Sequence, residues 1–545
     1  MRAETRKTGC WLGIVFGLSV LVRFVLANFY PRTVNCYPDE FLYLSLGESL
    51  WNHHNIQVFN VASSFRKVLY PLVISPAFAF ADVKIRGTII AFINAGVISL
   101  GVFPVYGLAR RVLKEEKNIW LCVMLYVISP SMTYSMTYMS EVVSIPLSLL
   151  LVYFIFIFWE ENSPIRRMWI GVGVVFLMIL CYMAKSVALV FPVALALTYL
   201  TEWTLGKDRK KRAIALVLGF VMLTGLLWFG HNILLMANIF EKGYYIIFGV
   251  LFFLTITVLG FCVILVLLPG ICLGKLDENS KRLYGFLLYT VVVTAIVVTC
   301  MIYTAEDFPS LTPRAHLRYV EFLFVPFVIL LLRIMEREVK QVNRWKMLVA
   351  FGVWAVILLG VFRGFLGQTV DQTMLFYWQL FADEGKNFSP VKVRLLSLVI
   401  ILVIAEFIVL YYRNHQWFRR FLMTGLIVMS LGNSVLSIYV QYKTHSHSEE
   451  ETVEAEQLRE FVLEHSDENF LVLEPDNYCE MIDTFLVDCD NVRTGMKPVM
   501  LQVKHRFKKP LQVEYIIQCD AIYPAEEGME YITTYPNLGY SLYRK

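Results

Sequence analysis

Long apolar stretches separated by short polar loops dominate the chain. A helix needs roughly 20 mostly apolar residues to cross the hydrocarbon core of a bilayer. Stretches of this kind predict about 13 transmembrane helices and an all-α polytopic membrane protein. They lie at about 10–29, 86–109, 118–135, 139–158, 168–184, 186–203, 213–231, 245–272, 283–303, 319–334, 347–364, 392–412 and 421–440.

The polar loops predict the orientation of these helices. Basic residues gather in alternate loops, for example Arg110 with Arg111, and Arg419 with Arg420. Loops rich in Lys and Arg stay in the cytoplasm. We therefore expect a plasma-membrane protein with a cytoplasmic N-terminus, and an odd number of spans puts the C-terminus outside. The composition, 57% hydrophobic and 17% charged, excludes a soluble multidomain enzyme.

Three predicted outer segments, 30–85, 304–318 and 365–391, are too long to be turns. The first contains Leu42–Trp51, whose pattern predicts an amphipathic helix lying along the membrane interface. It closes with Tyr70–Pro76, where two prolines interrupt the helix and return the chain to the membrane.

The composition becomes polar and acidic near residue 442. We therefore divide the chain into a transmembrane domain, 1–441, and a small extracytoplasmic α/β domain, 442–545. Helical periodicity marks Glu451–Glu464. Predicted strands of the second domain are Asn469–Glu474, Gln512–Ile517 and, at the end of the chain, Leu538–Tyr543.

The cysteines and paired histidines of the second domain give weaker signals. Cys479 and Cys489 could form a disulfide in an oxidising compartment, but Cys519 makes the number of cysteines odd. His445 and His447 have a metal-ligand spacing, yet such a pair in an acidic linker is typically solvated.

Charged residues at the membrane edge are the candidates for chemistry, because a charge in lipid is costly. The first candidates are Asp39 and Glu40, which follow the first span directly. Asp39 could be a general base whose geometry or basicity Glu40 adjusts. The alternative is a solvated turn in which Asp39 caps a helix. The dipeptide alone does not separate the two interpretations.

Glu141 and Lys185 are two further candidates at predicted outer ends of spans. Glu141 could face the Asp39 loop as a partner carboxylate, or it could simply favour the N-terminus of its helix. Lys185 could meet a phosphate, or it could extend toward lipid headgroups as an interfacial lysine.

A cluster of Arg314, His316, Arg318 and Tyr319 precedes the tenth span. Arginine donors match the oxygens of a phosphate, so this cluster suits an anionic head group on the outer surface. The alternative is an anchor to lipid headgroups, with Tyr319 in the aromatic belt. The outer loops otherwise contain few positive charges, which favours the first interpretation.

Taken together, these motifs resemble the GT-C superfamily of membrane glycosyltransferases, in particular the protein O-mannosyltransferase and lipid A aminoarabinose transferase branch. The likeness covers roughly residues 10–440. It rests on Asp39-Glu40 in the first outer loop, Tyr70-Pro71, Tyr106–Arg111, Ser140-Glu141 and Arg318-Tyr319. Many relatives have Arg where this chain has Lys185, and the tail shares only its outer position.

The resemblance implies transfer of a sugar from a polyprenyl-phosphate donor to an outer acceptor, with inversion. Asp39 would be the base. Arg318, with Arg314, His316, Lys185 and Tyr319, would bind the donor phosphate. No cofactor is required, although Glu40 and Glu141 could hold a divalent cation. The expected partners are this donor, membrane lipids and a lipid, glycan or protein acceptor, with no nucleic acid.

A transporter or flippase for a lipid-linked or anionic substrate is the alternative. Such folds usually contain internal repeats and charges near the middle of the membrane. This sequence has no convincing repeat, and its strongest charges lie at the predicted outer edge. Convergence of Asp39, Glu141 and Arg318 on one cavity would favour the enzyme.

Overall fold

A computed structural model describes most of the helical part and most of the C-terminal domain. The described residues are 2–29, 38–58, 61–62, 67–205, 239–261, 266, 269–304, 316–336, 345, 352, 373, 415–445, 449–473, 485–494, 513–519 and 529–545. The predicted spans 213–231, 347–364 (apart from residue 352) and 392–412, and Arg314 of the predicted phosphate site, lie outside these residues.

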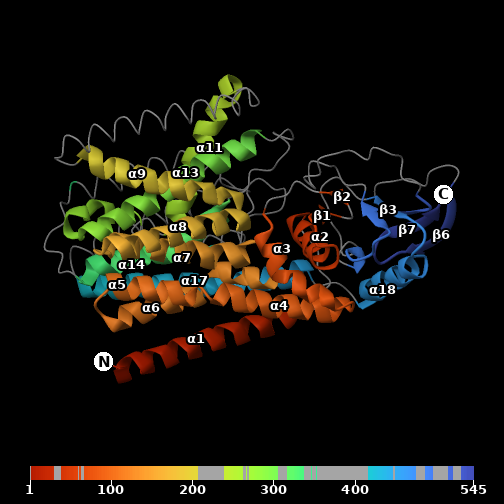
Figure 1. Cartoon of the computed structure of the whole chain (residues 1–545), viewed down its shortest axis with the longest axis horizontal. Coiled ribbons are helices and arrows are strands. Elements are labelled where there is room, and N and C mark those ends of the chain that lie inside the picture. The colour runs from red at the N-terminus through yellow and green to blue at the C-terminus, as the bar shows by residue number, and fades with distance from the viewer. Residues whose placement is uncertain are drawn as a thin grey trace, which may run out of the picture.

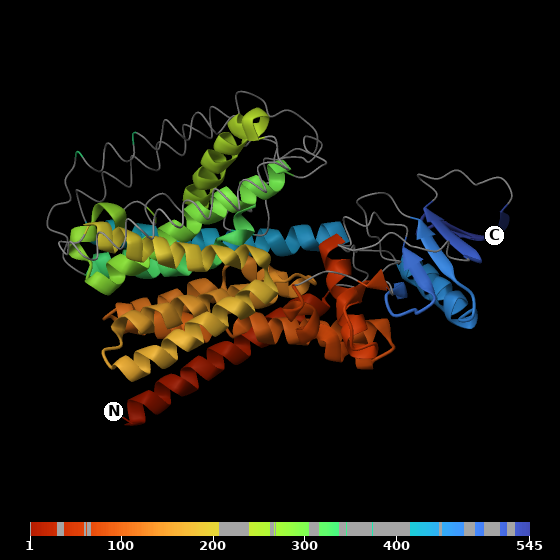
Figure 2. The same cartoon turned by 45° about the horizontal axis from the view of Figure 1, so that its top comes forward.

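The larger part of the molecule is a bundle of helices that run in similar directions (Figure 1). Its N-terminus lies at the end of the bundle away from the C-terminal domain, in both Figure 1 and Figure 2. The helices are α1 (Arg2–Asn28), α4 (Val83–Ser99), α5 (Val102–Val112), α6 (Glu116–Val127), α7 (Glu141–Glu160), α8 (Pro164–Ala184), α9 (Val190–Leu205), α11 (Ile239–Gly260), α13 (Glu278–Thr304), α14 (Phe324–Glu336) and α17 (His415–His445).

Within the described part of the chain, seven helices are long and apolar enough to cross a membrane. An eighth is formed if α6 and the turn η2 (Pro130–Met136) count as one span bent by 44°. Large apolar side chains stay exposed on α1, for example Trp11, Leu18 and Val22, as expected of a helix that faces lipid. The chain is a multi-pass membrane protein, and the predicted total of about 13 spans stays a prediction.

Helix α7 lies at the centre of the bundle. It packs against α4, α5 and α8, and most of its apolar span is buried. Pro146 lies inside the helix, where it removes one backbone donor. Because neighbouring helices enclose α7, its first residue, Glu141, is held at a fixed position at one end of the bundle.

Helix α2 (Pro38–Asn52) follows the predicted turn after the first span. Proline at the first helical position and two acidic residues in the first turn both favour a helix start there. The prediction of a helix is confirmed, its polar side is not exposed, and its position along the membrane interface stays a prediction. The stretch from Phe41 to Ser49 is buried throughout.

The enclosure of α2 has a local cause. The segments α3 (Leu69–Ile74) and η1 (Ser75–Ala79) pack against it, and Gly47 allows their close approach. A Cβ atom at Gly47 would lie only 3.1 Å from the Phe78 ring. The polar side is covered as well, since the Ser49 hydroxyl donates to Asn55 Oδ1 at 2.7 Å. The chain's own turn therefore replaces water along the polar face.

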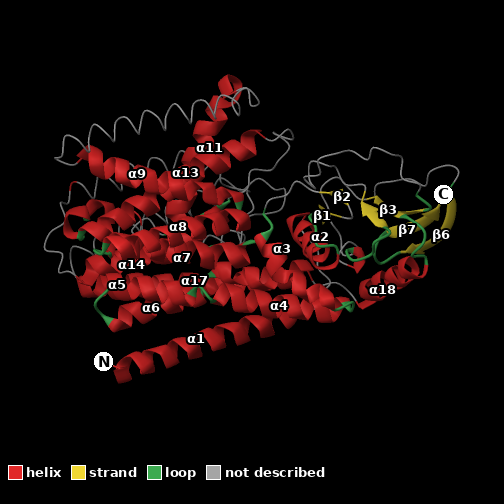
Figure 3. Cartoon of the chain, viewed as in Figure 1, coloured by secondary structure: helices red, strands yellow, loops and turns green. Residues whose placement is uncertain are grey.

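The C-terminal domain contains helix α18 (Glu449–Glu464) and a five-stranded sheet (Figure 3). The strand order is β4-β3-β5-β7-β6. Strand β3 pairs in parallel with β4 and β5, whereas β7 pairs antiparallel with β5 and β6. The strands are β3 (Phe470–Leu473), β4 (Val492–Thr494), β5 (Tyr515–Cys519), β6 (Glu530–Tyr535) and β7 (Tyr540–Arg544).

The structure confirms the predicted helix and the three predicted strands of this domain, with β5 starting three residues later than predicted. Strands β4 and β6 were not predicted. Cys489 is a buried free thiol, which does not support the bridge to Cys479 that the sequence left possible. Cys479 lies outside the described residues.

The C-terminal domain contacts the segment between α1 and α4, beside α2, and the start of α4 (Figures 1 and 2). Asp488 is the centre of this contact. Its carboxylate accepts from Arg86 of α4 at 2.8 Å and from two nitrogens of Arg459 of α18, at 2.6 and 2.9 Å. All three side chains are largely buried. We call these three residues the Asp488 ion triad.

Candidate functional site

A small cavity of about 40 Å³ lies where five separate parts of the chain meet. It contains three basic and two acidic side chains, together with hydroxyl groups. Its lining residues are Asp39, Tyr43, Lys67, Ser140, Glu141, Lys185, Ser186, Val187, Arg318 and Tyr319. We call it the Asp39 cavity. It brings together Asp39, Glu141, Lys185, Arg318 and Tyr319, which the sequence singled out separately.

Asp39 lies at the mouth of the cavity. It belongs to the first turn of α2, and its side chain is 56% exposed. Its Oδ2 atom is 3.9 Å from Arg318 Nη2, which is the outer limit of an ion pair. A carboxylate held there can accept a proton from a molecule that enters from solvent while remaining close to a cation.

Glu141 lies at the base of the same group of charges. It is the first residue of α7, and only 2% of its side chain is exposed. Lys185 Nζ donates a hydrogen bond to Glu141 Oε1, and Arg318 Nε lies 3.5 Å from the same oxygen. Glu141 therefore holds two cations side by side, which is a positioning role.

Lys185 lies in the turn between α8 and η3 (Ser186–Leu189), and Arg318 and Tyr319 belong to the short turn η5 (Leu317–Tyr319). Lys185 Nζ is 4.4 Å from the centre of the Tyr319 ring, and Arg318 Cζ is 5.4 Å from it. The ring face attracts both cations. Burial lowers the pKa of Lys185, and the adjacent Glu141 carboxylate opposes this effect.

Tyr43 and Lys67 complete the cavity, although sequence reasoning did not assign them to the site. Tyr43 lies one helical turn after Asp39 and donates to Ser140 Oγ at 3.1 Å. Burial raises the pKa of Tyr43, and the Asp39 and Glu141 carboxylates raise it further, so its hydroxyl remains a donor. The spacing of four residues from Asp39 could have identified Tyr43.

Glu40 and His316 do not line the Asp39 cavity. Glu40 is buried and accepts a hydrogen bond from the Tyr138 amide at 2.8 Å, so it joins α2 to the segment before α7. The His316 ring lies 5.9 Å from the Tyr319 ring. The predicted roles of Glu40, as a modulator or metal ligand, and of His316, as a phosphate ligand, stay predictions.

A second cavity, of about 30 Å³, shares Lys185, Arg318 and Tyr319 with the first. Its other walls come from α7, α8 and α9, for example Ser148, Cys181 and Phe191. A larger cavity of about 640 Å³ has walls of apolar side chains from the same three helices, farther along them. Both therefore follow the contact between α7, α8 and α9. We call this contact the α7–α9 path.

One group of three metal-ligating side chains occurs among the described residues: Glu48, His53 and Asp490. It lies at the other end of α2 and does not include Glu40 or Glu141. The predicted cation site at Glu40 and Glu141 stays a prediction.

Comparison with known proteins gives a structural likeness only. No family model matches the chain, and no curated protein matches it. Two crystal structures of ArnT from Cupriavidus metallidurans are similar to it, one in the apo state and one bound to undecaprenyl phosphate. Each has a TM-score of 0.54 and 10% sequence identity, and covers 98% of this chain. The alignment covers 98% of the apo chain and 97% of the bound chain.

This likeness shows the fold. The chain has the GT-C fold, with apolar helices followed by a small C-terminal sheet, as the sequence predicted. At 10% identity, residue roles do not follow from the match, so they depend on the geometry of the Asp39 cavity.

Proposed function

We propose that this protein is an integral-membrane glycosyltransferase that moves a sugar from a polyprenyl-phosphate donor to an acceptor on the outer face of the membrane. The observation that carries the proposal is the Asp39 cavity, where an exposed carboxylate faces two partly buried cations. With Lys67 included, three basic and two acidic side chains leave one excess positive charge. That charge suits a phosphate.

The arrangement separates the base from the leaving group. Asp39 accepts the proton of the acceptor hydroxyl or amine as this group attacks the anomeric carbon. The bond between the anomeric carbon and the phosphate oxygen breaks, and its electron pair goes to that oxygen. Lys185 and Arg318 stabilise the new negative charge. Attack opposite the leaving phosphate inverts the anomeric carbon.

Glu141 prepares the phosphate site. Without a counter-charge, two adjacent buried cations would repel each other. The Glu141 carboxylate contacts both Lys185 and Arg318, so they stay close together before the donor arrives. Because these cations supply the positive charge, the transfer step does not require a metal.

The α7–α9 path supports a lipid-linked donor. The second cavity starts at Lys185 and Arg318 and continues over Val190 and Phe191 into the apolar part of the bundle. The walls of the larger cavity then include Leu195 and Tyr199 on the same helix. A polyprenyl chain lying along this path would put its phosphate at the cations. The undecaprenyl phosphate bound to ArnT, which shares the fold, agrees with this donor class.

The proposed orientation places the Asp39 cavity and the C-terminal domain outside and the N-terminus in the cytoplasm. Basic loops predict this orientation. The N-terminus and the C-terminal domain lie at opposite ends of the bundle, which agrees with it (Figure 2). The acceptor would then be an outer lipid, glycan or protein.

Asp39→Asn tests the proposed base. Transfer of radiolabelled sugar by the purified protein in lipid nanodiscs should fall by about 10²- to 10⁴-fold, the usual contribution of a general base. The protein should still fold, because Asp39 is more than half exposed. Asp467→Asn, an exposed position in the C-terminal domain, is the matched control and should keep full activity.

The same preparation distinguishes an enzyme from a flippase. A glycosyltransferase produces a sugar-modified acceptor and free polyprenyl phosphate in nanodiscs, where no second compartment exists. A flippase moves a fluorescent polyprenyl phosphate across a vesicle membrane without forming product. Transport without transfer, unaffected by Asp39→Asn, would replace the proposed function with the flippase.

A further inference from the structure

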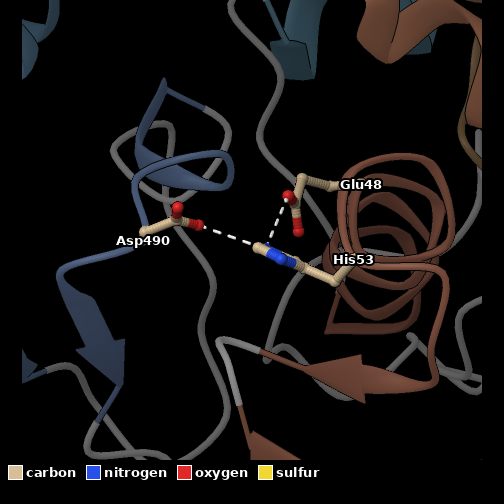
Figure 4. Close-up of side chains that lie close together, drawn as sticks. All are labelled: Glu48, His53 and Asp490. Atoms are coloured by element: carbon tan, nitrogen blue, oxygen red, sulfur yellow. Dashed lines mark hydrogen bonds and ion pairs between the residues drawn. The ribbon is translucent and has the colours of Figure 1, made fainter.

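A second group of converging side chains lies between α2 and the C-terminal domain (Figure 4). Glu48 comes from the last turns of α2, His53 from the turn that follows, and Asp490 from the segment before β4. In Figure 4 the His53 ring points between the two carboxylates. The three donor atoms lie within 4.8 Å of one another.

The distances suit ligands of one small metal ion. His53 Nε2 is 3.5 Å from Glu48 Oε1 and 3.1 Å from Asp490 Oδ1. Two ligand atoms that are each about 2.0–2.1 Å from a tetrahedral metal are about 3.3 Å apart. The two distances from His53 lie on either side of this value, and the Glu48 and Asp490 oxygens lie within 4.8 Å of each other, so a metal ion requires only modest movements of these side chains.

The local charges favour a divalent cation. Glu48 is only 6% exposed, whereas Asp490 is 77% exposed. The group combines two carboxylates with one imidazole. The neighbouring Arg493 donates to the main-chain carbonyl of Asp490 at 2.6 Å.

The arginines of the Asp488 ion triad bind a different carboxylate. Arg86 and Arg459 both bind Asp488. Two arginines and one carboxylate leave the triad with one excess positive charge, and both arginines contact Asp488.

We propose that Glu48, His53 and Asp490 form a binding site for a divalent transition-metal cation, with Zn²⁺ as the preferred ion. One imidazole nitrogen and two carboxylate oxygens are ligands that zinc accepts, and imidazole disfavours Mg²⁺ and Ca²⁺. The exposed side, at Asp490, provides an entry path and room for a water as the fourth ligand.

The site is structural. Glu48 is nine residues after Asp39 on α2, which corresponds to about 14 Å along the helix. A metal at Glu48 therefore does not reach the Asp39 cavity. It joins the C-terminal domain to the helix that carries Asp39. The inference does not depend on glycosyl transfer, because metal binding is measured directly.

The test uses the full chain purified in detergent, with Zn²⁺ alone as the probe. After chelation and dialysis, we expect titration calorimetry and elemental analysis to give one Zn²⁺ per chain. Co²⁺ in its place should give the visible absorption of a tetrahedral site. His53→Gln should weaken binding by more than the 10- to 100-fold that loss of an outer-shell partner typically causes. Asn52→Ala, which removes a donor to Glu48 Oε1, should stay within that range.

His54→Asn is the matched control. His54 is the neighbouring residue and has a left-handed backbone conformation, with φ 53°, which Asn tolerates well. It should bind Zn²⁺ like the unmodified protein. His53 is partly exposed, so its variant should fold, and gel filtration without metal checks this.

The proposal would be overturned if His53→Gln and Asp490→Asn both bound Zn²⁺ as tightly as the unmodified protein does. It would also be overturned if the unmodified protein bound no Zn²⁺. Loss of sugar transfer in Asp39→Asn with unchanged Zn²⁺ binding would separate this site from the proposed catalysis.

Discussion

The two ends of α2 differ in charge and therefore in the ligands that they suit. At its first turn, Asp39 faces a cavity in which basic side chains outnumber acidic ones. At its last turn, Glu48 belongs to a group in which two carboxylates share one imidazole. The first arrangement suits an anion and the second suits a cation. One buried helix thus connects two sites of opposite preference.

The two ends also differ in which carboxylate is accessible. Asp39 is more than half exposed, whereas Glu48 is buried. An accessible carboxylate can exchange protons with a substrate. A buried one lowers the stability of the fold unless a cation compensates its charge. Accessibility therefore separates a reactive role from a structural one, and the following variants examine this difference.

Glu141→Gln should have the largest effect on stability. It leaves Lys185 and Arg318 partly buried without their shared counter-charge, which typically costs about 3–5 kcal/mol. Thermal unfolding in detergent measures the loss. Glu160→Gln, at the other end of α7, is the matched control. Its ion pair with Arg111 is partly exposed, so the change should cost no more than about 1 kcal/mol. Similar losses in both variants would refute a special role for Glu141.

Arg318→Ala should weaken binding of polyprenyl phosphate. A hydrogen bond to a charged group contributes about 1.5–3 kcal/mol, so the dissociation constant should rise by roughly 10- to 150-fold. Arg318→Lys should lose less, because it keeps the charge. Arg282→Ala, which breaks a partly exposed pair with Glu202, serves as the control in a fluorescence binding assay. If Arg318→Ala bound polyprenyl phosphate with unchanged affinity, the phosphate would not bind in the Asp39 cavity.

The Asp488 ion triad should respond cooperatively. Arg86→Gln or Arg459→Gln alone leaves Asp488 with one arginine, whereas the double variant leaves a buried carboxylate unpaired. The double variant should lose about 0.5–3 kcal/mol more than the sum of the single losses. Limited proteolysis and thermal unfolding would measure it. Lys84→Gln breaks the exposed pair with Glu456 and should have little effect. If the loss in the double variant equalled the sum of the two single losses, Arg86 and Arg459 would not act together on Asp488.

Glu48→Gln should have the smallest effect and should depend on pH. Because the pKa of Glu48 is raised in the folded protein, its contribution is most favourable below the pKa of the unfolded state, about 4.3. This contribution of Glu48 to stability declines as the pH rises through the pKa that Glu48 has in the folded protein. Metal-free Glu48→Gln should therefore become more stable than the unmodified protein at neutral pH and equal to it in acid.

Saturating Zn²⁺ should reverse this order at neutral pH, because only the unmodified protein gains binding free energy. The groups that face Glu48 are His53, Asp490 and Asp488, with Asn52 on the same helix. A difference between the two proteins that stays constant from pH 4 to 8, without metal, would contradict the assignment to Glu48.

The sequence predicted the elements that have strong local signals. The long apolar helices, α2, α18 and strand β3 were all predicted. Strands β4 and β6 were missed, since β4 has only three residues and β6 alternates exposed and partly buried positions weakly. The burial of α2 was also missed, because its polar side chains bind groups in its own turn that the pattern does not show.

The Asp39 cavity was partly predictable because charge near a membrane edge is rare. That rule selected Asp39, Glu141, Lys185 and Arg318 from distant positions, and the structure brings them together. The roles of these residues stay predictions. The group of Glu48, His53 and Asp490 was not predictable, because outer loops and soluble domains contain many acidic residues. Only the three-dimensional contact distinguishes Asp490 from the others.

The contact between His53 and Asp490 also sets an order of assembly. The two residues are 437 positions apart in the chain. At about 5–20 residues per second, the ribosome makes Asp490 roughly 20 to 90 s after His53. During that interval the first loop lacks its partner domain. The contact can therefore form only after most of the chain has been made, and a chain that stops before Asp490 keeps the Asp39 helix without this contact.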